Sequence, residues 1–267
     1  MIASIVTITY NNISGFKQTA ESIIKQSEQS FEWIVIDGGS SDGTVEYLKS
    51  LSRQPDYWVS ERDRGIYDAL NKGISRATGQ YVCCMNAGDC FYDFDVLAKV
   101  YKYNLTGDII YGNWTLIEKK KRINVQAPVE MPSYYFFFEH NLCHQAMFVK
   151  TALLRESPFD TSYKICADHK KWQDFMLQQC TFQYINVRVC IHDNRDGISS
   201  DIHSKQFVSE LERMLSEMPR GLRLISALEK SEKDMLRKKN TKHLRQVRIL
   251  AVISILLLFC LILSICI

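Results

Sequence analysis

Four aspartates stand at places in the chain where an enzyme could use them. Asp37, Asp63 and Asp89 each follow a predicted strand, and Asp168 lies at the start of a predicted helix. Carboxylates at the ligand edge of a sheet suit a hard divalent cation such as Mg²⁺, which keeps few protein ligands and takes others from phosphates. A carboxylate without a metal could serve as a general base. These residues are compatible with a nucleotide-dependent transferase.

The stretch from Ser60 to Asp89 contains two of these carboxylates and the elements that would hold them. Its apolar residues follow the spacing of a one-sided helix, at Ile66, Ala69, Leu70, Gly73 and Ile74. The apolar run YVCCM at 81–85 is typical of a strand covered on both faces. Asp89 would then lie just past the carboxyl end of a buried strand, where open α/β sheets bind ligands.

The N-terminal segment predicts a βαβ unit, which implies a parallel sheet with a right-handed crossover. Strands are expected at 3–10 and 31–36, with a helix between them that Ser14 could cap. The run DGGSSDGT at 37–44 follows the second strand but lacks the P-loop lysine and the G-x-G-x-x-G pattern. Taken alone, it reads equally well as a ligand loop or as an ordinary turn that caps the next helix.

The second half of the chain continues the alternation of strands and helices. Strands are expected at 108–111, 114–118, 143–149, 182–187 and 189–191, and helices at 94–103, 151–156, 167–179 and 205–218. The basic run KKKR at 119–122 is interpreted as a solvated hairpin tip. Five consecutive aromatic residues at 134–138 are more than one core face can bury, so they could line an acceptor groove or lie near a membrane interface.

Composition and charge restrict the class of protein. The chain has 267 residues, of which 46% are hydrophobic and 24% charged, as in ordinary globular proteins. Residues 230–248 contain eight Lys or Arg and two acidic residues, a net charge of +6, whereas the whole chain has +3, so the body is mildly acidic and does not resemble a nucleic-acid surface. The nine cysteines are odd in number and form no C-x-x-C pair, which favours reduced thiols in a cytosolic compartment.

The C-terminal residues 249–267 contain no charged residue. At about 1.5 Å per residue they would span roughly 28 Å, close to the thickness of a bilayer core, so we expect a transmembrane tail anchor there. The alternative is a buried helix covered on all sides. The basic segment before it would place the body on the cytoplasmic side of the membrane. The expected organisation is a globular domain at 1–200, an amphipathic and basic helical segment at 201–248, and the anchor at 249–267.

Six segments, taken in order, resemble the inverting glycosyltransferases of family 2, in particular the bacterial branch that builds surface polysaccharides such as O-antigen, colanic acid and capsule. They are SIVTITYN, EWIVIDGGSSDGT, SERDRGIYDALNKGISRATGQYV, MNAGD, CHQAMFV and ADHKKWQDF. The resemblance covers about residues 2 to 200. It implies an α/β, Rossmann-like GT-A fold with a mostly parallel central sheet flanked by helices, followed here by C-terminal helices and the transmembrane helix. It also implies a nucleotide-diphosphate-sugar donor.

The resemblance assigns roles to residues of the donor pocket. By position in the matching segments, the donor-binding residues would be Thr7, Thr9, Tyr10, Asp37, Asp63, Lys72 and Asn86. Asp37 would hydrogen-bond the uracil ring if the donor is a UDP-sugar. Asp89 matches the last acidic residue of the family's DxD-like element, which binds Mg²⁺ or Mn²⁺ between the two phosphates. This chain departs from that element at Gly88, where many members have a second aspartate.

The acceptor side is assigned in the same way. Asp168 matches the family's catalytic base, with Ala167 in place of the usual glutamate. Its alternative role is an ordinary first-turn aspartate, which the helix dipole would favour. His144 and Gln145 match a His-Gln pair expected beside the donor sugar or the acceptor, and His192 could reach the diphosphate or the metal. A single histidine in a strand is also commonly structural.

Together these assignments imply a membrane-anchored enzyme on the cytoplasmic face of the inner membrane that transfers sugar to a lipid-linked saccharide. A non-catalytic nucleotide-sugar-binding or scaffold subunit is the alternative, because Gly88 and Ala167 depart from the family pattern. A nucleotidyltransferase is disfavoured because SIVTITYNN lacks a Gly-rich, basic triphosphate loop. The sequence does not indicate an oligomeric state.

Overall fold

The structure is a computed structural model that describes residues 1–132, 136–195, 197, 203–219 and 221. Residues Met1–Met214 form one compact unit, which contains the whole sheet, and Leu215–Ile267 form a second. The strands are β1 (Ala3–Thr9), β2 (Phe31–Asp37), β3 (Tyr57–Ser60), β4 (Tyr81–Cys84), β5 (Cys90–Phe91), β6 (Ile109–Glu118), β7 (Lys121–Val125), β8 (Met147–Lys150) and β9 (Phe182–Asp193). The helices are α1 (Ile13–Ile24), α2 (Thr44–Ser50), α3 (Ile66–Arg76), α4 (Val96–Tyr101), α5 (Phe136–Glu139), α6 (Thr151–Glu156), α7 (Ala167–Leu177) and α8 (Lys205–Glu217), with a 3₁₀ turn η1 (His144–Ala146).

The strands form one mixed sheet in the order β3-β2-β1-β4-β8-β6-β9-β5, with β7 paired to β6. The first four strands are parallel, as the βαβ pattern predicts. The other half is mixed, so the expectation of a mostly parallel sheet is wrong there: β6 runs parallel to β9, but β8 runs antiparallel to both β4 and β6, and β5 antiparallel to β9. An apolar run indicates that a strand is buried but does not indicate its direction, so the sequence pattern could not predict the antiparallel pairs.

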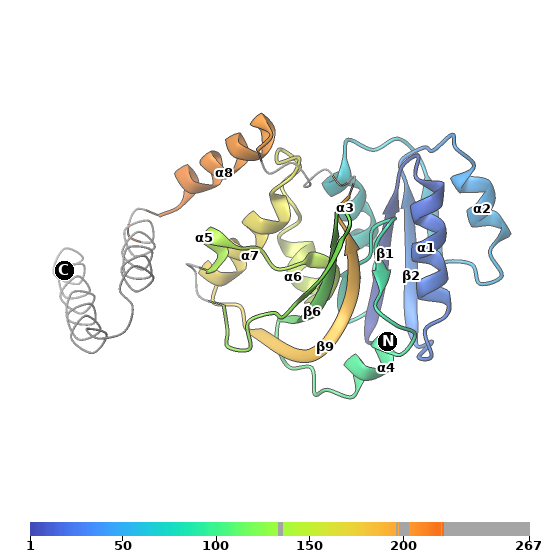
Figure 1. Cartoon of the computed structure of the whole chain (residues 1–267), viewed down its shortest axis with the longest axis horizontal. Helices are drawn as coiled ribbons and strands as arrows, with labels where there is room; N and C mark the ends of the chain where they lie inside the picture. The colour runs from blue at the N-terminus through green and yellow to red at the C-terminus, as the bar shows by residue number, and fades with distance from the viewer. Residues whose placement is uncertain (133–135, 196, 198–202, 220, 222–267) are drawn as a thin grey trace. The chain divides into compact units, whose positions relative to one another are not determined.

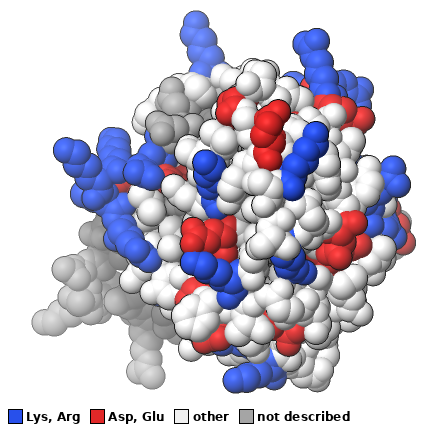
Figure 2. Space-filling view, turned by 90° about the vertical axis from the view of Figure 1, so that its right-hand side faces the viewer, with Lys and Arg blue, Asp and Glu red and all other residues white. Residues whose placement is uncertain are grey.

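Helices cover both faces of the sheet, and each face has its own apolar core (Figure 1). One core joins the sheet to Phe16 of α1, Leu48 of α2 and Leu97 of α4. The other joins it to Leu70 of α3 and Trp172 of α7. On the face where α1 and α2 lie, acidic and basic side chains are interspersed (Figure 2).

Three local predictions needed correction. The pairs of strands expected at 108–118 and at 182–191 are single long strands, β6 and β9. Their mutual register shifts near Gly112, where a Cβ would lie 2.5 Å from the carbonyl oxygen of Val187, and this irregularity interrupts the alternating pattern. Helix α1 is capped by Asn12 and not by Ser14, because the Asn12 side chain accepts a hydrogen bond from the Gly15 N–H.

The segment 143–149, expected to be a strand throughout, is a 3₁₀ turn at His144–Ala146 followed by β8. A strand would point His144 and Gln145 to opposite faces of the sheet. The turn instead lets both polar side chains line the same cavity.

The aromatic run at 134–138 is only partly described, and its described part belongs to the core. Phe137 is fully buried and packs against the ring of Phe182. In the described part of the chain, no helix is long and apolar enough to cross a membrane. The expected anchor at 249–267 and most of the basic segment before it lie outside the described residues, and the three-part organisation of the chain stays a prediction.

Candidate active site

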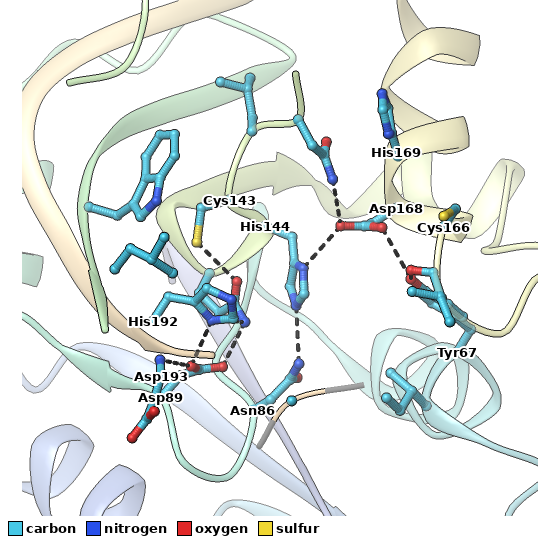
Figure 3. Close-up of a pocket in the computed structure, with 18 of the residues that line it drawn as sticks. Tyr67, Asn86, Asp89, Cys143, His144, Cys166, Asp168, His169, His192 and Asp193 are labelled. Atoms are coloured by element: carbon cyan, nitrogen blue, oxygen red, sulfur yellow. Dashed lines mark hydrogen bonds and ion pairs between the residues drawn. The ribbon is translucent and has the colours of Figure 1, made fainter. Parts of the chain in front are cut away.

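A cavity of about 390 Å³ lies where the loop after β4, the turn η1, the end of β9 and the start of α7 meet (Figure 3). It brings together six of the residues that the sequence singled out, which are Asn86, Asp89, His144, Gln145, Asp168 and His192. The remaining wall is largely apolar and includes Trp114, Leu116 and Phe207. The prediction that Asp89 follows the carboxyl end of a buried strand is confirmed, since β4 ends at Cys84.

The loop that carries Asp89 depends on a glycine. Gly88 has a φ of +109°, a backbone conformation that side-chain-bearing residues rarely adopt. The Thr19 hydroxyl accepts the Gly88 N–H and donates to the Asp89 carbonyl at 2.6 Å, and Asn12 Nδ2 donates to the Ala87 carbonyl. Gly88 therefore shapes a turn that is held by α1, which gives a conformational reason for the missing second aspartate.

Asp89 is buried, and both of its carboxylate oxygens have partners. Gln145 Nε2 donates to Oδ2 at 2.6 Å, while His192 Nδ1 and the Asp193 backbone N–H each lie 2.9 Å from Oδ1. Burial favours neutral His192, but the hydrogen bond and negative charge of Asp89 raise the pKa of His192 to about 9. At neutral pH this pair brings a positive imidazolium to the cavity wall.

The Mg²⁺ or Mn²⁺ expected at Asp89 can be tested against these contacts. A carboxylate offers about four lone-pair sites, and three donors contact Asp89, so one site remains. Within the described ranges no group of three or more His, Cys, Asp or Glu side chains could hold a metal ion. The residues fit a cation bound by one protein carboxylate that takes its other ligands from phosphate and water, as Mg²⁺ commonly does.

Asp168 lies in the first turn of α7 and is held by side chains from three other segments. Tyr67 Oη lies 3.1 Å from Oδ1, while Asn141 Nδ2 and His144 Nδ1 lie 3.0 and 3.3 Å from Oδ2. Burial raises the pKa of Asp168, but the hydrogen bond and charge of His144 outweigh it, and the pKa lies below its ordinary value. The group is thus an ionised carboxylate facing the cavity, as a general base requires.

The loop before Asp168 is held by a carboxylate from α8. Glu210 is buried and accepts the backbone N–H groups of residues 164, 165 and 166 at 2.7, 2.9 and 2.9 Å. Gln206 Nε2 donates to the same carboxylate at 2.6 Å. The residue that positions the start of α7 is therefore more than 40 positions away in the sequence.

Apart from Asn86, the residues predicted for donor binding are not among those that line the cavity. Tyr10 and Asp63 lie together beside Gly38, where an added Cβ would meet Asp63 Oδ2 at 2.7 Å and the Tyr10 ring at 3.1 Å. Tyr10 is 64% exposed, so its ring is open to a planar ligand. Their role in donor binding stays a prediction.

Three other predicted donor contacts, Asp37, Thr7 and Thr9, are buried, and two of them have partners inside the protein. Asp37 is fully buried and accepts hydrogen bonds from Gly39, Ser40 and Ser60, which join its loop to β3. Thr7 is buried and accepts from Trp33 Nε1 at 3.1 Å. The Thr9 hydroxyl is buried at the end of β1 without a partner among the described residues.

Lys72 contributes to the order of the loop between β3 and α3. Its ammonium lies 2.8 Å from Glu61 and 3.2 Å from the Arg62 carbonyl oxygen. The side chain is 28% exposed and does not line the cavity. Donor binding by Lys72 also stays a prediction.

Sequence reasoning missed Tyr67, Asn141 and Glu210, which contact Asp168 or the loop before it. Tyr67 lies within the matching stretch DRGIYDALNKG, so a signal for it was present. Asn141 lies in an irregular segment and Glu210 on the polar side of a predicted helix, and nothing in the local pattern distinguishes either residue. Gln145 is 2% exposed, with its amide oxygen 3.0 Å from Cys143 Sγ, so it acts here as a partner of Asp89.

Similar proteins were found by sequence. A family model described as Glycosyl transferase family 2 matches residues 4–161. A PGL/p-HBAD biosynthesis glycosyltransferase of Mycobacterium bovis BCG is 28% identical over 241 residues, which are 84% of this chain and 88% of that protein. An uncharacterized glycosyltransferase of Methanocaldococcus jannaschii is 25% identical over 223 residues, which are 78% and 77% of the two chains.

Solved structures share the fold. S. aureus TarS 1–349 in complex with UDP-GlcNAc has a TM-score of 0.64 and 15% identity, covering 94% of this chain and 79% of that one. The mannosyltransferase PcManGT from Pyrobaculum calidifontis, in complex with GDP-Man and Mn²⁺, has a TM-score of 0.55 and 16% identity, covering 95% and 80%. This chain spans 43% of a longer TarS chain. The likeness establishes a GT-A-like α/β fold with a mixed sheet flanked by helices.

Proposed function

The chain belongs to glycosyl transferase family 2, and from that premise we propose that it is a metal-dependent inverting glycosyltransferase of surface-polysaccharide synthesis. The donor is a nucleotide-diphosphate sugar, with a UDP-sugar as the first candidate. The acceptor is a hydroxyl of a lipid-linked saccharide. The observation that carries this proposal is the cavity with Asp168 on one wall and the Asp89–His192 pair on another.

The donor class is supported by two neighbours of the same fold. The TarS structure contains UDP-GlcNAc and the PcManGT structure contains GDP-Man, both nucleotide-diphosphate sugars. At 15% and 16% identity, these neighbours support the class of the donor and do not indicate which sugar or which nucleobase it carries. Tyr10, Asp63 and the Gly38 backbone between them form the proposed nucleoside side.

The reaction assigned to the site is one displacement. The acceptor oxygen bonds to the anomeric carbon, the bond from that carbon to the diphosphate oxygen breaks, and the acceptor's proton passes to the Asp168 carboxylate. A single displacement inverts the configuration at that carbon. Tyr67, Asn141 and His144 orient the carboxylate for this step. His192, protonated at neutral pH, supplies positive charge toward the diphosphate.

Asp89 would hold the Mg²⁺ or Mn²⁺, with His192 beside it. When bound, such a cation neutralises charge on the leaving diphosphate. The PcManGT structure contains Mn²⁺, and the remaining lone-pair site on Asp89 supports this part of the proposal.

The acceptor and the location rest on the sequence of the C-terminal region. A bilayer anchor at 249–267 would hold the active site on the cytoplasmic face of the inner membrane and raise the effective concentration of a lipid-linked acceptor. The apolar wall formed by Trp114, Leu116 and Phe207 is compatible with an amphiphilic acceptor.

The test is a panel of UDP- and GDP-sugars with Mg²⁺ or Mn²⁺ and a lipid-linked saccharide acceptor. We expect one donor to release its nucleoside diphosphate together with a new glycoside of inverted configuration. Donor binding without transfer to any acceptor would indicate the alternative, a non-catalytic subunit. A retained configuration would overturn the single-displacement mechanism.

A further inference from the structure

A polar chain crosses the cavity from the donor side to the base. Asn86 Nδ2 lies 3.1 Å from His144 Nε2, and His144 Nδ1 lies 3.3 Å from Asp168 Oδ2 (Figure 3). Asn86 belongs to the same loop as Asp89, and Asp168 begins α7. The His144 side chain is 18% exposed and that of Asp168 is 12% exposed, so solvent competes weakly for these bonds.

The partners of the imidazole determine its tautomer. An ionised carboxylate only accepts hydrogen bonds, so Nδ1 of His144 carries the proton that faces Asp168. In the neutral ring Nε2 is then an acceptor, and the Asn86 amide nitrogen is the donor that satisfies it. A hydrogen-bond partner on the second ring nitrogen commonly fixes the tautomer and the orientation of a histidine side chain.

This arrangement leaves the Asn86 Oδ1 atom buried and without a partner among the described residues. An unpaired buried acceptor is destabilising, so a conformation that pairs it is favoured. If His144 becomes protonated, rotation of the Asn86 amide by half a turn would place Oδ1 against the new Nε2–H. The Asn86 side chain can therefore form a hydrogen bond with His144 Nε2 in either protonation state of the ring.

We propose that His144 is a positioning residue for the Asp168 base, and that Asn86 couples this pair to the loop that binds the donor. The inference rests on the proposed function and deepens it. It replaces the expectation that His144 contacts sugar or acceptor. The transferred proton goes from the acceptor hydroxyl to Asp168, and His144 keeps its own Nδ1–H throughout.

The surrounding charges agree with this role. Burial lowers the pKa of His144, but the hydrogen bond and charge of Asp168 raise it above its ordinary value. Cys143 on the same segment and Asp89 on the facing loop act in the same direction. Around Asp168 itself lie Tyr67 of α3, Cys84 of β4 and the Asp168 neighbours Cys166 and His169.

One test needs no turnover. In the full-length protein with ¹⁵N-labelled histidine, the His144 resonances would be assigned by their loss in His144→Gln. We expect Asp168→Asn to lower the pKa of His144, because the carboxylate that stabilises the imidazolium is gone. We expect Asn86→Ala to keep the Nδ1–H form, because Asp168 still accepts that proton, and to shift the Nε2 resonance, which loses its hydrogen-bond donor. An unchanged His144 titration in Asp168→Asn would overturn the proposal.

The second test uses transfer kinetics. His144→Gln should lower kcat roughly 10-fold, about the loss of one positioned hydrogen bond, while KM for the donor changes less than twofold. Because His144 lowers the pKa of Asp168, its loss raises that pKa, and the acid limb of the kcat/KM profile should move to higher pH. His140→Gln is the matched control, since His140 is exposed and does not line the cavity.

A raised donor KM with unchanged kcat and pH profile would make His144 a ligand contact and overturn the proposal. Thermal unfolding of both glutamine variants checks that the fold is intact. If the wild-type protein transfers no sugar from any donor, the proposed function fails. The histidine titration still decides whether His144 and Asp168 are coupled.

Discussion

At the scale of single residues, the site consists of two buried carboxylates with different partners. Asp168 is contacted by Tyr67, Asn141 and His144, and the hydrogen bond and charge of His144 hold its pKa below the ordinary value. Asp89 is contacted by a histidine that is protonated at neutral pH, which directs positive charge into the cavity. Environments that separate the roles of two acidic groups are a common feature of catalytic sites.

Replacing the base tests the first of these roles. Asp168→Asn should abolish transfer, a loss of at least 100-fold in kcat, because an amide cannot accept the acceptor's proton. Donor binding should stay largely intact, since Asp168 lies on the opposite wall from Asp89. Calorimetric donor titration beside a transfer assay separates the two effects. Near-normal turnover would remove Asp168 as the base.

Replacing Asp89 tests the second role. Asp89→Ala should lose metal-dependent activity, because the only carboxylate assigned to the cation is removed and His192 loses the group that keeps it protonated. The measurement is transfer rate against Mg²⁺ and Mn²⁺ concentration. Full activity of this variant in excess EDTA would rule out the metal role of Asp89.

Gly88 permits a prediction about the departure from the family pattern. Gly88→Asp and Gly88→Ala should each lower the unfolding free energy by about 1–2 kcal/mol, because a side-chain-bearing residue is strained at a φ of +109°. No steric clash adds to this cost, since the nearest atom to an added Cβ is Asn12 Nδ2 at 3.8 Å. Urea unfolding measures this. The aspartate variant should gain no metal affinity over the alanine variant. Tighter metal binding at unchanged stability would show that the loop readily accepts a second carboxylate.

At the scale of elements, α8 determines the position of the base as much as α7 does. The Glu210 carboxylate binds three consecutive backbone N–H groups just before Asp168. Phe207 of the same helix lines the cavity. The helix therefore contributes both to the loop that carries Asp168 and to the wall of the cavity.

Removing this contact should affect stability and rate together. Glu210→Ala leaves three backbone donors unpaired, and we expect a loss of about 3 kcal/mol in unfolding free energy and a fall in kcat. Glu212→Ala on the exposed side of α8 is the control and should stay within about 0.5 kcal/mol of wild type. Equal effects of the two variants would contradict the positioning role of Glu210.

At the scale of the whole molecule, one mixed sheet separates two apolar cores, and the site lies at the carboxyl ends of β4 and β9. The parallel half ends at the loop of Asp89, and the mixed half brings η1 and the end of β9 to the same place. Asp89 lies in segment 86–89, and its side-chain partners come from segments 143–146 and 190–193. Only the order of strands in the sheet makes these three segments neighbours.

The proposed anchor is tested on the whole chain. A chain that ends at about residue 228 should be recovered in the soluble fraction after cell lysis, because the uncharged run 249–267 is gone. The full-length chain should sediment with the membranes. If the shortened chain still sediments, membrane association would come from the amphipathic helices instead.

The sequence alone was enough for the family, the βαβ half and the two central carboxylates. These depend on local order: continuous apolar runs, apolar residues at helical spacing, and motifs such as MNAGD and ADHKKWQDF. Asp89 after β4 and Asp168 at the start of α7 follow directly from such patterns.

The tertiary structure decided what these carboxylates contact. The antiparallel pairing of β8 with β4, the contacts of His144 with Asn86 and of Gln145 with Asp89, and the contact of Glu210 with residues 164–166 all join segments far apart in the chain. Local residue patterns record burial and turn chemistry, whereas a hydrogen bond across the sheet depends on which strands become neighbours. The partners of Asp168 became visible only once the chain was folded.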